Sequence, residues 1–327
     1  MKIVVLDDYQ DEVKSLTCAG LLAEDELIVY NDTVRDPNML AERLDGAEAV
    51  VLIRDRTTLS RALIEKLPDL RLVSCIGRPG GYVDVDACTE HGIAVADGGP
   101  GHSPATVEHT WALILASMRK LCLEDRRLRA GRWQTSLGIG CLEGRVLGIY
   151  GYGRLGKKVA DIGPAFGMRV LVHGTQNSID KAAADGYDTV PDKAAFFREA
   201  DVVSLHLRLN DATRGIVGLE DLSSMKRDAL FVNASRAELV ARGALEEALR
   251  QGRPGYAAVD VYEEEPVIGA SHPLLAFDNV VCSPHMGFVD RDCYELYFKA
   301  AFGNVKAFQA GENANIVNPQ ALTRRAS

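Results

Sequence analysis

The sequence has no C-x-x-C pair, no excess of positive charge and no apolar run that approaches the roughly 18 residues of a membrane span. Its seven cysteines are odd in number and scattered, so they indicate neither a disulfide framework nor a zinc site. Free thiols of this kind are typical of a reducing compartment. The apolar run in the N-terminal MKIVVLDDYQ is too short for a signal peptide. We therefore expect a cytoplasmic protein that does not cross a membrane.

The charge balance argues against general binding of polyanions. The chain carries 37 basic and 46 acidic residues, for a formal net charge of −9, which disfavours contact with nucleic acid or an anionic membrane surface. The basic run EDRRLRAGR at 124–132 is interleaved with acids and small residues and is typical of a solvated helix face. With 327 residues, 47% of them hydrophobic and 25% charged, the chain is long enough for about two domains of roughly 150 residues each.

Short apolar runs alternate with amphipathic segments along the chain, which predicts βαβ units and parallel sheets. A first block contains the strand candidates KIVVLD, LIVY, AVVLI and RLVSCI and ends at the Gly/Pro-rich GIAVADGGPGHSP. One continuous helical pattern then covers residues 105–131 and stops at Gly131. A second block offers six strand candidates: RVLGIYG, RVLVHG, DVVSLHL, ALFVNAS, GYAAVDVY and NVVCSP. We expect an α/β fold with one domain inserted in another, and a last helix at about 290–309 that returns to the first domain.

The segment LGIYGYGRLGKKVA contains a G-x-G-x-x-G pattern at Gly151, Gly153 and Gly156, between a predicted strand and a predicted helix. The first glycine permits a tight turn, the second lets the backbone approach a pyrophosphate, and the third lets helix and strand pack closely. The N-terminus of the following helix adds N–H groups and the positive end of a dipole. This context predicts a dinucleotide site. A structural turn and a site for S-adenosylmethionine are the alternatives.

The acidic residue that usually follows such a loop by about 20 positions is missing. After the next predicted strand, GMRVLV, the chain reads HGTQNS at 173–178, which contains no acid. Asp180 comes too late, and Lys181 is the nearest cation. An acid in this segment would pair with the ribose hydroxyls of NAD and repel the 2′-phosphate of NADP. The sequence therefore leaves NAD and NADP both open.

Three chemically capable side chains each follow a predicted strand of the second block: Arg236 in FVNASRAELV, Glu265 in VDVYEEEP and His285 in VVCSPHMG. The carboxyl ends of parallel strands meet at the edge where α/β sheets bind ligands. There a guanidinium can hold a carboxylate with two hydrogen bonds, and an imidazole can exchange a proton with an adjacent oxygen. The acid would orient the imidazole and stabilise its charged form. Taken singly, each residue is more simply explained by an exposed loop or a turn, and their joint placement favours a site.

These motifs, with DVVSLHL and MKRDALFVNASRAELV and in this order, resemble the D-isomer-specific 2-hydroxyacid dehydrogenase family over nearly the whole chain. The likeness is to the phosphoglycerate dehydrogenases and the glyoxylate and hydroxypyruvate reductases. It implies two Rossmann-like domains, a substrate domain at 1–102 and 288–327 and a dinucleotide-binding domain at 103–287. It implies hydride transfer between the nicotinamide of NAD or NADP and C2 of a small D-2-hydroxy acid or 2-keto acid. It also implies a homodimer, with part of the interface on the helix that starts near Ala105.

The resemblance further implies roles for individual residues. Arg236 would anchor the substrate carboxylate, His285 would act as acid/base, and Glu265 would tune His285. Substrate contacts would come from Arg54 and from the loop CIGRPGGYVD, in which Arg78, Gly80 and Gly81 are the candidates. Cofactor contacts would come from Gly151, Gly153, Arg154, Leu155, Gly156, Gly174, Thr175, His206, Ser235, Asp260 and Thr106.

The chain also departs from the family pattern. Ala237 stands where a glycine commonly follows the arginine, and Arg208 stands where a proline is usual two positions after the histidine of DVVSLHL. The chain ends soon after NPQAL, so we expect it to lack the regulatory domain of phosphoglycerate dehydrogenases. The aromatic residues that follow His285 are expected in a helix core, where one or two would line an apolar pocket: Phe288, Tyr294, Tyr297 and Phe298.

The alternative function is a non-catalytic NAD(H)-sensing protein, because the same family contains transcriptional corepressors that bind NADH. The Arg236, Glu265 and His285 set does not separate the two functions, since those relatives keep it. The chain shows no added tail or basic arm, which favours the enzyme. Oxidation of NADH or NADPH by a panel of 2-keto acids would distinguish them.

Overall fold

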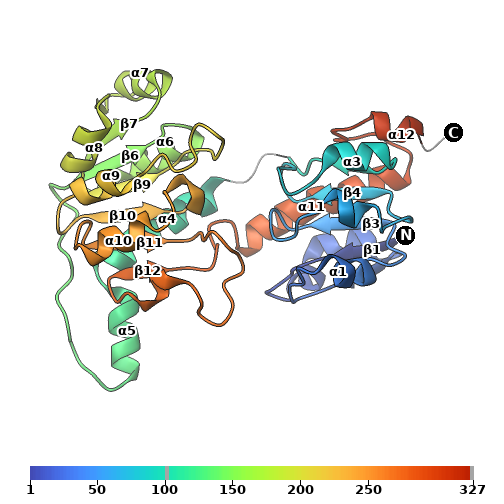
Figure 1. The fold of residues 1–327 in the computed structure, drawn as a ribbon, viewed down its shortest axis with the longest axis horizontal. Coiled ribbons are helices and arrows are strands. Elements are labelled where there is room, and N and C mark those ends of the chain that lie inside the picture. Colours follow the sequence, from blue (N-terminus) through green and yellow to red (C-terminus); the bar gives the residue numbers. More distant parts are fainter. Residues whose placement is uncertain (100–102, 325–327) are drawn as a thin grey trace. The chain divides into compact units, whose positions relative to one another are not determined.

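The computed structural model describes residues 1–99 and 103–324, which form two compact units (Figure 1). The first unit comprises Met1–His102 with Asp290–Ser327, and the second comprises Ser103–Val289. The chain therefore leaves the first unit and later returns to it, and the predicted insertion of one α/β domain in another is confirmed. In the described ranges, no helix has the length and apolar character needed to cross a membrane.

The first unit is built on a parallel sheet of order β2-β1-β3-β4-β5. Its inner strands are mostly apolar and buried, because helices cover both faces of the sheet. The short strand β5 was not predicted as a strand, because its residues were interpreted only as the end of the first block. The strands are β1 (Lys2–Val5), β2 (Glu26–Val29), β3 (Ala49–Leu52), β4 (Leu72–Cys75) and β5 (Ala94–Ala96). The helices are η1 (Val13–Ser15), η2 (Thr17–Leu22), α1 (Pro37–Arg43), α2 (Arg61–Ile64), α3 (Val85–Glu90), α11 (Arg291–Gln309) and α12 (Gln320–Arg324).

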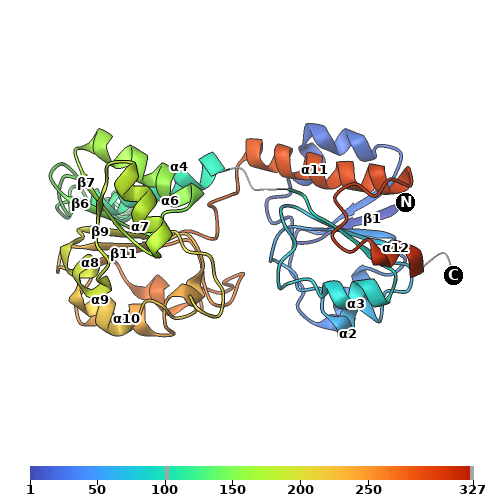
Figure 2. The same cartoon turned by 90° about the horizontal axis from the view of Figure 1, so that it is seen from above.

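Helix α11 confirms the predicted last helix and its return to the first unit. It begins at the capping residue Asp290, whose carboxylate accepts a hydrogen bond from the N–H of Cys293. It packs on η2 and β4, and Figure 2 shows it on the face of the sheet opposite α2 and α3. The hydroxyl of Ser74 in β4 donates to the carbonyl of Ala301. The predicted aromatic residues of its inner face are buried, namely Tyr294, Tyr297 and Phe298, and Phe302 is buried with them.

The second unit carries a seven-stranded parallel sheet of order β12-β11-β10-β9-β6-β7-β8. All six predicted strands are present, and β8 adds a two-residue strand that its sequence did not indicate. Helices α4 and α6 cover one face, and α8, α9 and α10 cover the other (Figure 2). The strands are β6 (Val146–Tyr150), β7 (Arg169–His173), β8 (Asp188–Thr189), β9 (Val202–Leu205), β10 (Leu230–Asn233), β11 (Tyr256–Val259) and β12 (Val280–Cys282). The helices are α4 (Ser103–Met118), α5 (Leu121–Arg129), α6 (Arg154–Ile162), η3 (Gly163–Phe166), α7 (Gln176–Ala184), α8 (Lys193–Glu199), α9 (Leu219–Ser224), η4 (Ala237–Leu239), α10 (Ala244–Arg250) and η5 (Pro273–Ala276).

The single helix predicted over residues 105–131 is wrong, because the chain forms α4 and α5 with a break between them. Lys120 adopts a left-handed conformation at the break, with φ of 51°. The carbonyl of Met118 accepts a hydrogen bond from the N–H of Ile139, which lies in the loop that folds back from α5. A carbonyl that is satisfied by this loop no longer needs a helical partner. The predicted stop at Gly131, where φ is 76°, is found as expected.

Candidate active site

The glycine turn follows β6 directly and opens α6. Gly151 has φ of 99°, and a Cβ on it would lie 2.8 Å from the carbonyl oxygen of His206. A Cβ on Gly156 would lie 2.1 Å from the carbonyl oxygen of Gly151, so only glycine lets the helix approach the turn. Around the Cβ position of Gly153, in contrast, there is no atom within 4 Å among the described residues. The turn therefore combines two sterically required glycines with an open position, as a pyrophosphate cradle requires.

The start of α6 adds the electrostatic part of this cradle. Gly153 occupies the N-cap and offers no side-chain cap to the first-turn N–H groups. These groups lie at the positive end of the helix dipole, where a phosphate is favoured. Arg154 and Leu155 are the first two helical residues, so both predicted contacts fall in this turn. The residues present therefore fit the diphosphate of a dinucleotide.

The end of β7 lies beside the glycine turn. A Cβ on Gly174 would come within 3.7 Å of the Cα of Gly151, and Thr175 caps α7 by accepting a hydrogen bond from the N–H of Ser178. Asp180 lies inside α7, where it accepts from the side chain of Gln176. The segment that meets a ribose in such domains thus ends in small polar groups, as the sequence indicated.

His206 packs against the same turn from the end of β9. Its Nε2 lies 2.9 Å from the hydroxyl of Ser204, and desolvation lowers the pKa of the imidazole to about 4. The ring is therefore neutral near pH 7. His206 packs beside Gly156, whose Cβ position lies 3.2 Å from the Cβ of His206, and it adds no charge there.

The loop after β10 holds Ser235 and Arg236 in a fixed turn. The N–H of Ser235 donates to Oδ1 of Asn233, and its hydroxyl donates to the carbonyl of Leu205, which ties the ends of β10 and β9 together. The amide of Asn233 donates to the carbonyl of Arg236. Nη1 of Arg236 donates to the carbonyl of Ser235 at 2.7 Å. The half-buried guanidinium is thus held at the carboxyl end of β10.

Glu265 and His285 form a direct pair. Nδ1 of His285 lies 2.6 Å from Oε2 of Glu265, and Oε1 of Glu265 accepts a hydrogen bond from the N–H of Tyr262 at 2.8 Å. A carboxylate can only accept, so Nδ1 of His285 carries the proton that it shares with Glu265, and Nε2 is left as the other hydrogen-bonding atom of the ring. His285 has φ of 55°, a costly conformation for a residue with a side chain. The ring packs edge-to-face on Phe288, which is buried as predicted but lies in a turn before α11 and not in a helix.

The strand order brings the three predicted residues to one edge of the sheet. Arg236, Glu265 and His285 follow β10, β11 and β12, and these strands are neighbours in the order β12-β11-β10. All pairings among them are parallel, so their carboxyl ends share the edge at which the glycine turn also lies. A guanidinium, an imidazole paired with a carboxylate and a phosphate cradle therefore lie on one edge, and groups of these types can serve the reduction of a carbonyl beside a carboxylate.

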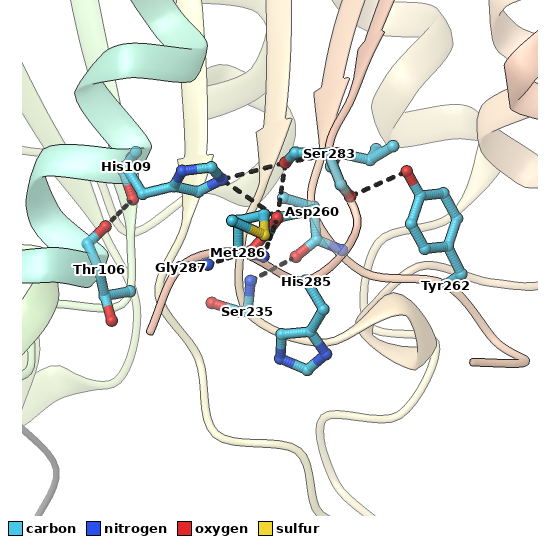
Figure 3. Close-up of polar contacts among 12 residues, drawn as sticks. Thr106, His109, Ser235, Asp260, Tyr262, Ser283, His285, Met286 and Gly287 are labelled. Atoms are coloured by element: carbon cyan, nitrogen blue, oxygen red, sulfur yellow. Dashed lines mark hydrogen bonds and ion pairs between the residues drawn. The ribbon is translucent and has the colours of Figure 1, made fainter. Parts of the chain in front are cut away.

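Asp260 lies behind this edge and is the centre of a hydrogen-bond network (Figure 3). Its side chain is 1% exposed and accepts from the N–H groups of Met286 and Gly287 and from the hydroxyl of Ser283. Nε2 of His109 in α4 lies 3.1 Å from Oδ1 of Asp260. Burial raises the pKa of the carboxyl, but these hydrogen bonds outweigh it, so the pKa lies below its ordinary value.

Sequence reasoning missed His109 and Ser283, although it selected Thr106 and Asp260. Thr106 and His109 lie one turn apart on α4, and the Cβ position of Gly287 is 3.8 Å from an atom of each. The available signal was a polar pair at i and i+3, which lie on the same side of a helix.

The four predicted substrate contacts lie at the carboxyl edge of the first unit's own sheet. Arg54 follows β3 with φ of 52°, and Arg78 follows β4, with Nε 3.8 Å from a carboxylate oxygen of Asp97. The hydroxyl of Tyr82 donates to the carbonyl of Arg78 and closes the loop that contains the exposed Gly80 and Gly81.

Comparison with known proteins identifies the family. The sequence profile described as "D-isomer specific 2-hydroxyacid dehydrogenase, NAD binding domain" matches residues 111–287. A glyoxylate reductase from Aeropyrum pernix is 36% identical over 299 residues, which cover 88% of this chain and 87% of that protein. The chain belongs to the D-isomer-specific 2-hydroxyacid dehydrogenase family. This dehydrogenase is therefore an NAD-dependent oxidoreductase of the class that acts on 2-hydroxy acids.

Two further relatives of this dehydrogenase are named for phosphoglycerate and not for glyoxylate. A phosphoglycerate oxidoreductase from Vibrio cholerae O395 is 48% identical, with a TM-score of 0.92 over 95% of this chain and 99% of that one. A D-3-phosphoglycerate dehydrogenase from Methanocaldococcus jannaschii is 33% identical over 97% of this chain, which spans 59% of that longer protein. The match at 111–287 assigns NAD binding to the second unit of the dehydrogenase.

Proposed function

We propose that the enzyme interconverts a 2-keto acid and a D-2-hydroxy acid, with Arg236 as carboxylate anchor, His285 as acid/base and Glu265 as the partner that orients His285. The observation that carries this proposal is the 2.6 Å contact between Nδ1 of His285 and the Glu265 carboxylate, at the sheet edge that also bears Arg236. In the same proposal, the first unit supplies substrate contacts from Arg54 and from residues 78–81. The second unit holds the dinucleotide.

The proposed chemistry divides among the side chains as follows. The glycine turn at 151–156 would hold the dinucleotide, whose nicotinamide would supply or accept the hydride at C2 of the substrate. Nε2 of His285 gives its proton to the carbonyl oxygen as that oxygen becomes an alcohol, and takes the proton back in the oxidation direction. Glu265 accepts the hydrogen bond from Nδ1–H throughout, so it fixes the ring and stabilises the imidazolium. Arg236 binds the substrate carboxylate through two parallel hydrogen bonds and thereby aligns the carbonyl.

The test of this function is oxidation of NADH and of NADPH in the presence of glyoxylate, hydroxypyruvate, pyruvate and phosphohydroxypyruvate. All four share the carboxylate and carbonyl that Arg236 and His285 would address. We expect turnover with at least one of them. Cofactor binding without turnover of any 2-keto acid would instead favour the sensing, corepressor-like function.

The residues after β7 support a prediction about the dinucleotide. Wild type is expected to bind NADPH within about tenfold of NADH, because no carboxylate is present at 173–178 to repel a 2′-phosphate. Thr175→Asp should raise the Kd for NADPH by at least about tenfold and leave NADH binding intact, since an added charge near 4 Å costs on the order of 1–4 kcal/mol. Nucleotide fluorescence titration measures both values. Thr175→Asn is the matched control, because Asn and Asp both cap helices; equal effects of the two substitutions would contradict the charge explanation.

We infer that the enzyme is a homodimer that uses α5 and the loop after it. Large apolar side chains gather there in exposed positions, with Trp133 76% and Leu137 88% exposed in the single chain. Trp133→Ser combined with Leu137→Ser should convert a particle of twice 35.5 kDa to one of 35.5 kDa in light scattering. Met39→Ser removes an exposed apolar side chain from α1 and should leave the dimer intact. A wild-type particle of 35.5 kDa would contradict the inference.

A further inference from the structure

We propose that His109 is a positioning residue for this enzyme, which acts through Asp260 and Ser283 to hold the turn that carries His285. The inference rests on the proposed role of His285 as acid/base. It assigns no contact between His109 and substrate or cofactor. His109 lies on α4, whereas the turn that it supports follows β12 (Figure 3).

The directions of the hydrogen bonds around Asp260 make His109 a donor. Nε2 of His109 lies 3.1 Å from Oδ1 of Asp260 and 3.0 Å from the hydroxyl of Ser283. The Asp260 carboxyl has a lowered pKa, so it is ionised near pH 7 and can only accept. The single proton of the Ser283 hydroxyl is used in the 2.5 Å bond to the same Oδ1. Nε2 of His109 must therefore be the donor, shared between the carboxylate and the hydroxyl oxygen.

The Asp260 carboxylate holds the chain on both sides of His285. The N–H of Met286 donates to Oδ1 of Asp260 at 2.7 Å, and the N–H of Gly287 donates to Oδ2 at 2.8 Å. With Ser283, these contacts bracket His285 on both sides along the chain. Three donors converge on Oδ1 of Asp260, from His109, Ser283 and Met286. The loss of one of these hydrogen bonds should therefore alter the other two, because all three share one acceptor atom.

His285, which lies between Ser283 and Met286, has a strained backbone conformation. His285 has φ of 55°, a region that side-chain-bearing residues adopt only when the surroundings fix them there. Its own N–H donates to the carbonyl of Ser283, and that carbonyl also accepts from the hydroxyl of Tyr262. The strained residue is thus held from two sides, by Tyr262 on one and by the Asp260 network on the other. Loosening the network should let the imidazole leave its alignment.

Helix α4 packs closely on the turn that carries His285. The Cβ position of Gly287 lies 3.1 Å from Oδ2 of Asp260 and 3.8 Å from Cδ2 of His109. The His109 ring therefore fills the space directly against the turn while it donates to the acid beneath it. A phenylalanine at this position would fill the same space without the hydrogen bond. Its effect would therefore distinguish the contribution of the hydrogen bond from that of packing.

The experiment compares His109→Phe, which keeps a ring and loses the donor, with His109→Gln, whose Nε2 amide can replace the donor. His109→Phe is expected to lower kcat by about 10- to 100-fold, because misplacement of a reacting group by about 1 Å costs about that much. The KM for the 2-keto acid and the Kd for NADH should stay within about threefold of wild type. His109→Gln should recover kcat to within about fivefold of wild type.

A second readout does not depend on turnover. The ring resonances of His285 in ¹³C-labelled protein, assigned by their loss in His285→Ala, should shift in His109→Phe and keep their wild-type positions in His109→Gln. Unchanged His285 resonances in His109→Phe, or equal impairment by Phe and Gln, would overturn the inference. Full turnover by His285→Ala would instead overturn the proposed function, so the two failures are distinguishable.

Discussion

Replacement of His285 by alanine is expected to lower kcat by about 10²- to 10⁴-fold, the range that positioned acid/base groups contribute. The imidazole is the group that would give the carbonyl oxygen its proton as the hydride arrives at C2. Without it, the proton must come from water, which is neither positioned nor held by Glu265. Steady-state rates with the best 2-keto acid measure the effect. The Kd for NADH, measured by fluorescence, should stay within about twofold of wild type.

The control for this prediction is Glu265→Gln, which keeps a hydrogen-bonding side chain beside Nδ1 and removes its charge. It should reduce kcat less than the loss of the imidazole does, because the proton donor remains while its charged form loses a partner. A His285→Ala enzyme with wild-type kcat would exclude His285 as the acid/base. A collapse of NADH binding in this variant would show that the residue serves the cofactor instead.

Replacement of Arg236 by alanine is expected to lower kcat/KM by about 10²- to 10³-fold. The loss of one partner from a hydrogen-bonded charge pair costs about 2–5 kcal/mol, and each 1.4 kcal/mol is tenfold. Most of the loss should appear as a higher KM, because the carboxylate is bound both before and during hydride transfer. Initial rates as a function of 2-keto acid concentration separate KM from kcat.

Two further variants sharpen the test of Arg236. Arg236→Lys keeps the charge and loses the two-pronged geometry, so it should recover only part of kcat/KM. Arg242→Ala removes an exposed cation from the same unit and should leave kcat/KM unchanged. If Arg236→Ala and Arg242→Ala had equal effects, general electrostatic attraction rather than a carboxylate anchor would be responsible.

The parts of the fold that were predictable depend on local patterns. Strands buried on both faces read as continuous apolar runs, and the glycines of the turn are required by contacts within a few residues of β6 and β9. The placement of Arg236, Glu265 and His285 at one edge follows from a general rule, because the carboxyl ends of parallel neighbours lie together. The same rule makes the 2.6 Å contact between Glu265 and His285 predictable, because the two residues follow neighbouring strands.

The features that escaped prediction depend on distant partners. The break between α4 and α5 reflects the bond from Ile139 to the carbonyl of Met118, and nothing in the helical periodicity of the segment signals it. His109 is separated by 151 residues from Asp260, its partner in the network. Asp260 itself was selected as a cofactor contact, but in the structure its carboxylate accepts four hydrogen bonds from its own chain. Only the folded chain shows that these groups are in contact.

Transfer of deuterium from NADH or NADPH that carries two deuterium atoms at C4 of the nicotinamide tests the central claim most directly. Mass spectrometry locates the label in the product, and chiral chromatography gives its configuration. We expect one deuterium at C2 of a D-2-hydroxy acid with the wild-type enzyme, and a loss of this product with His285→Ala. A bound dinucleotide that passes no deuterium to any 2-keto acid, or that yields the L-isomer, would contradict the proposed function.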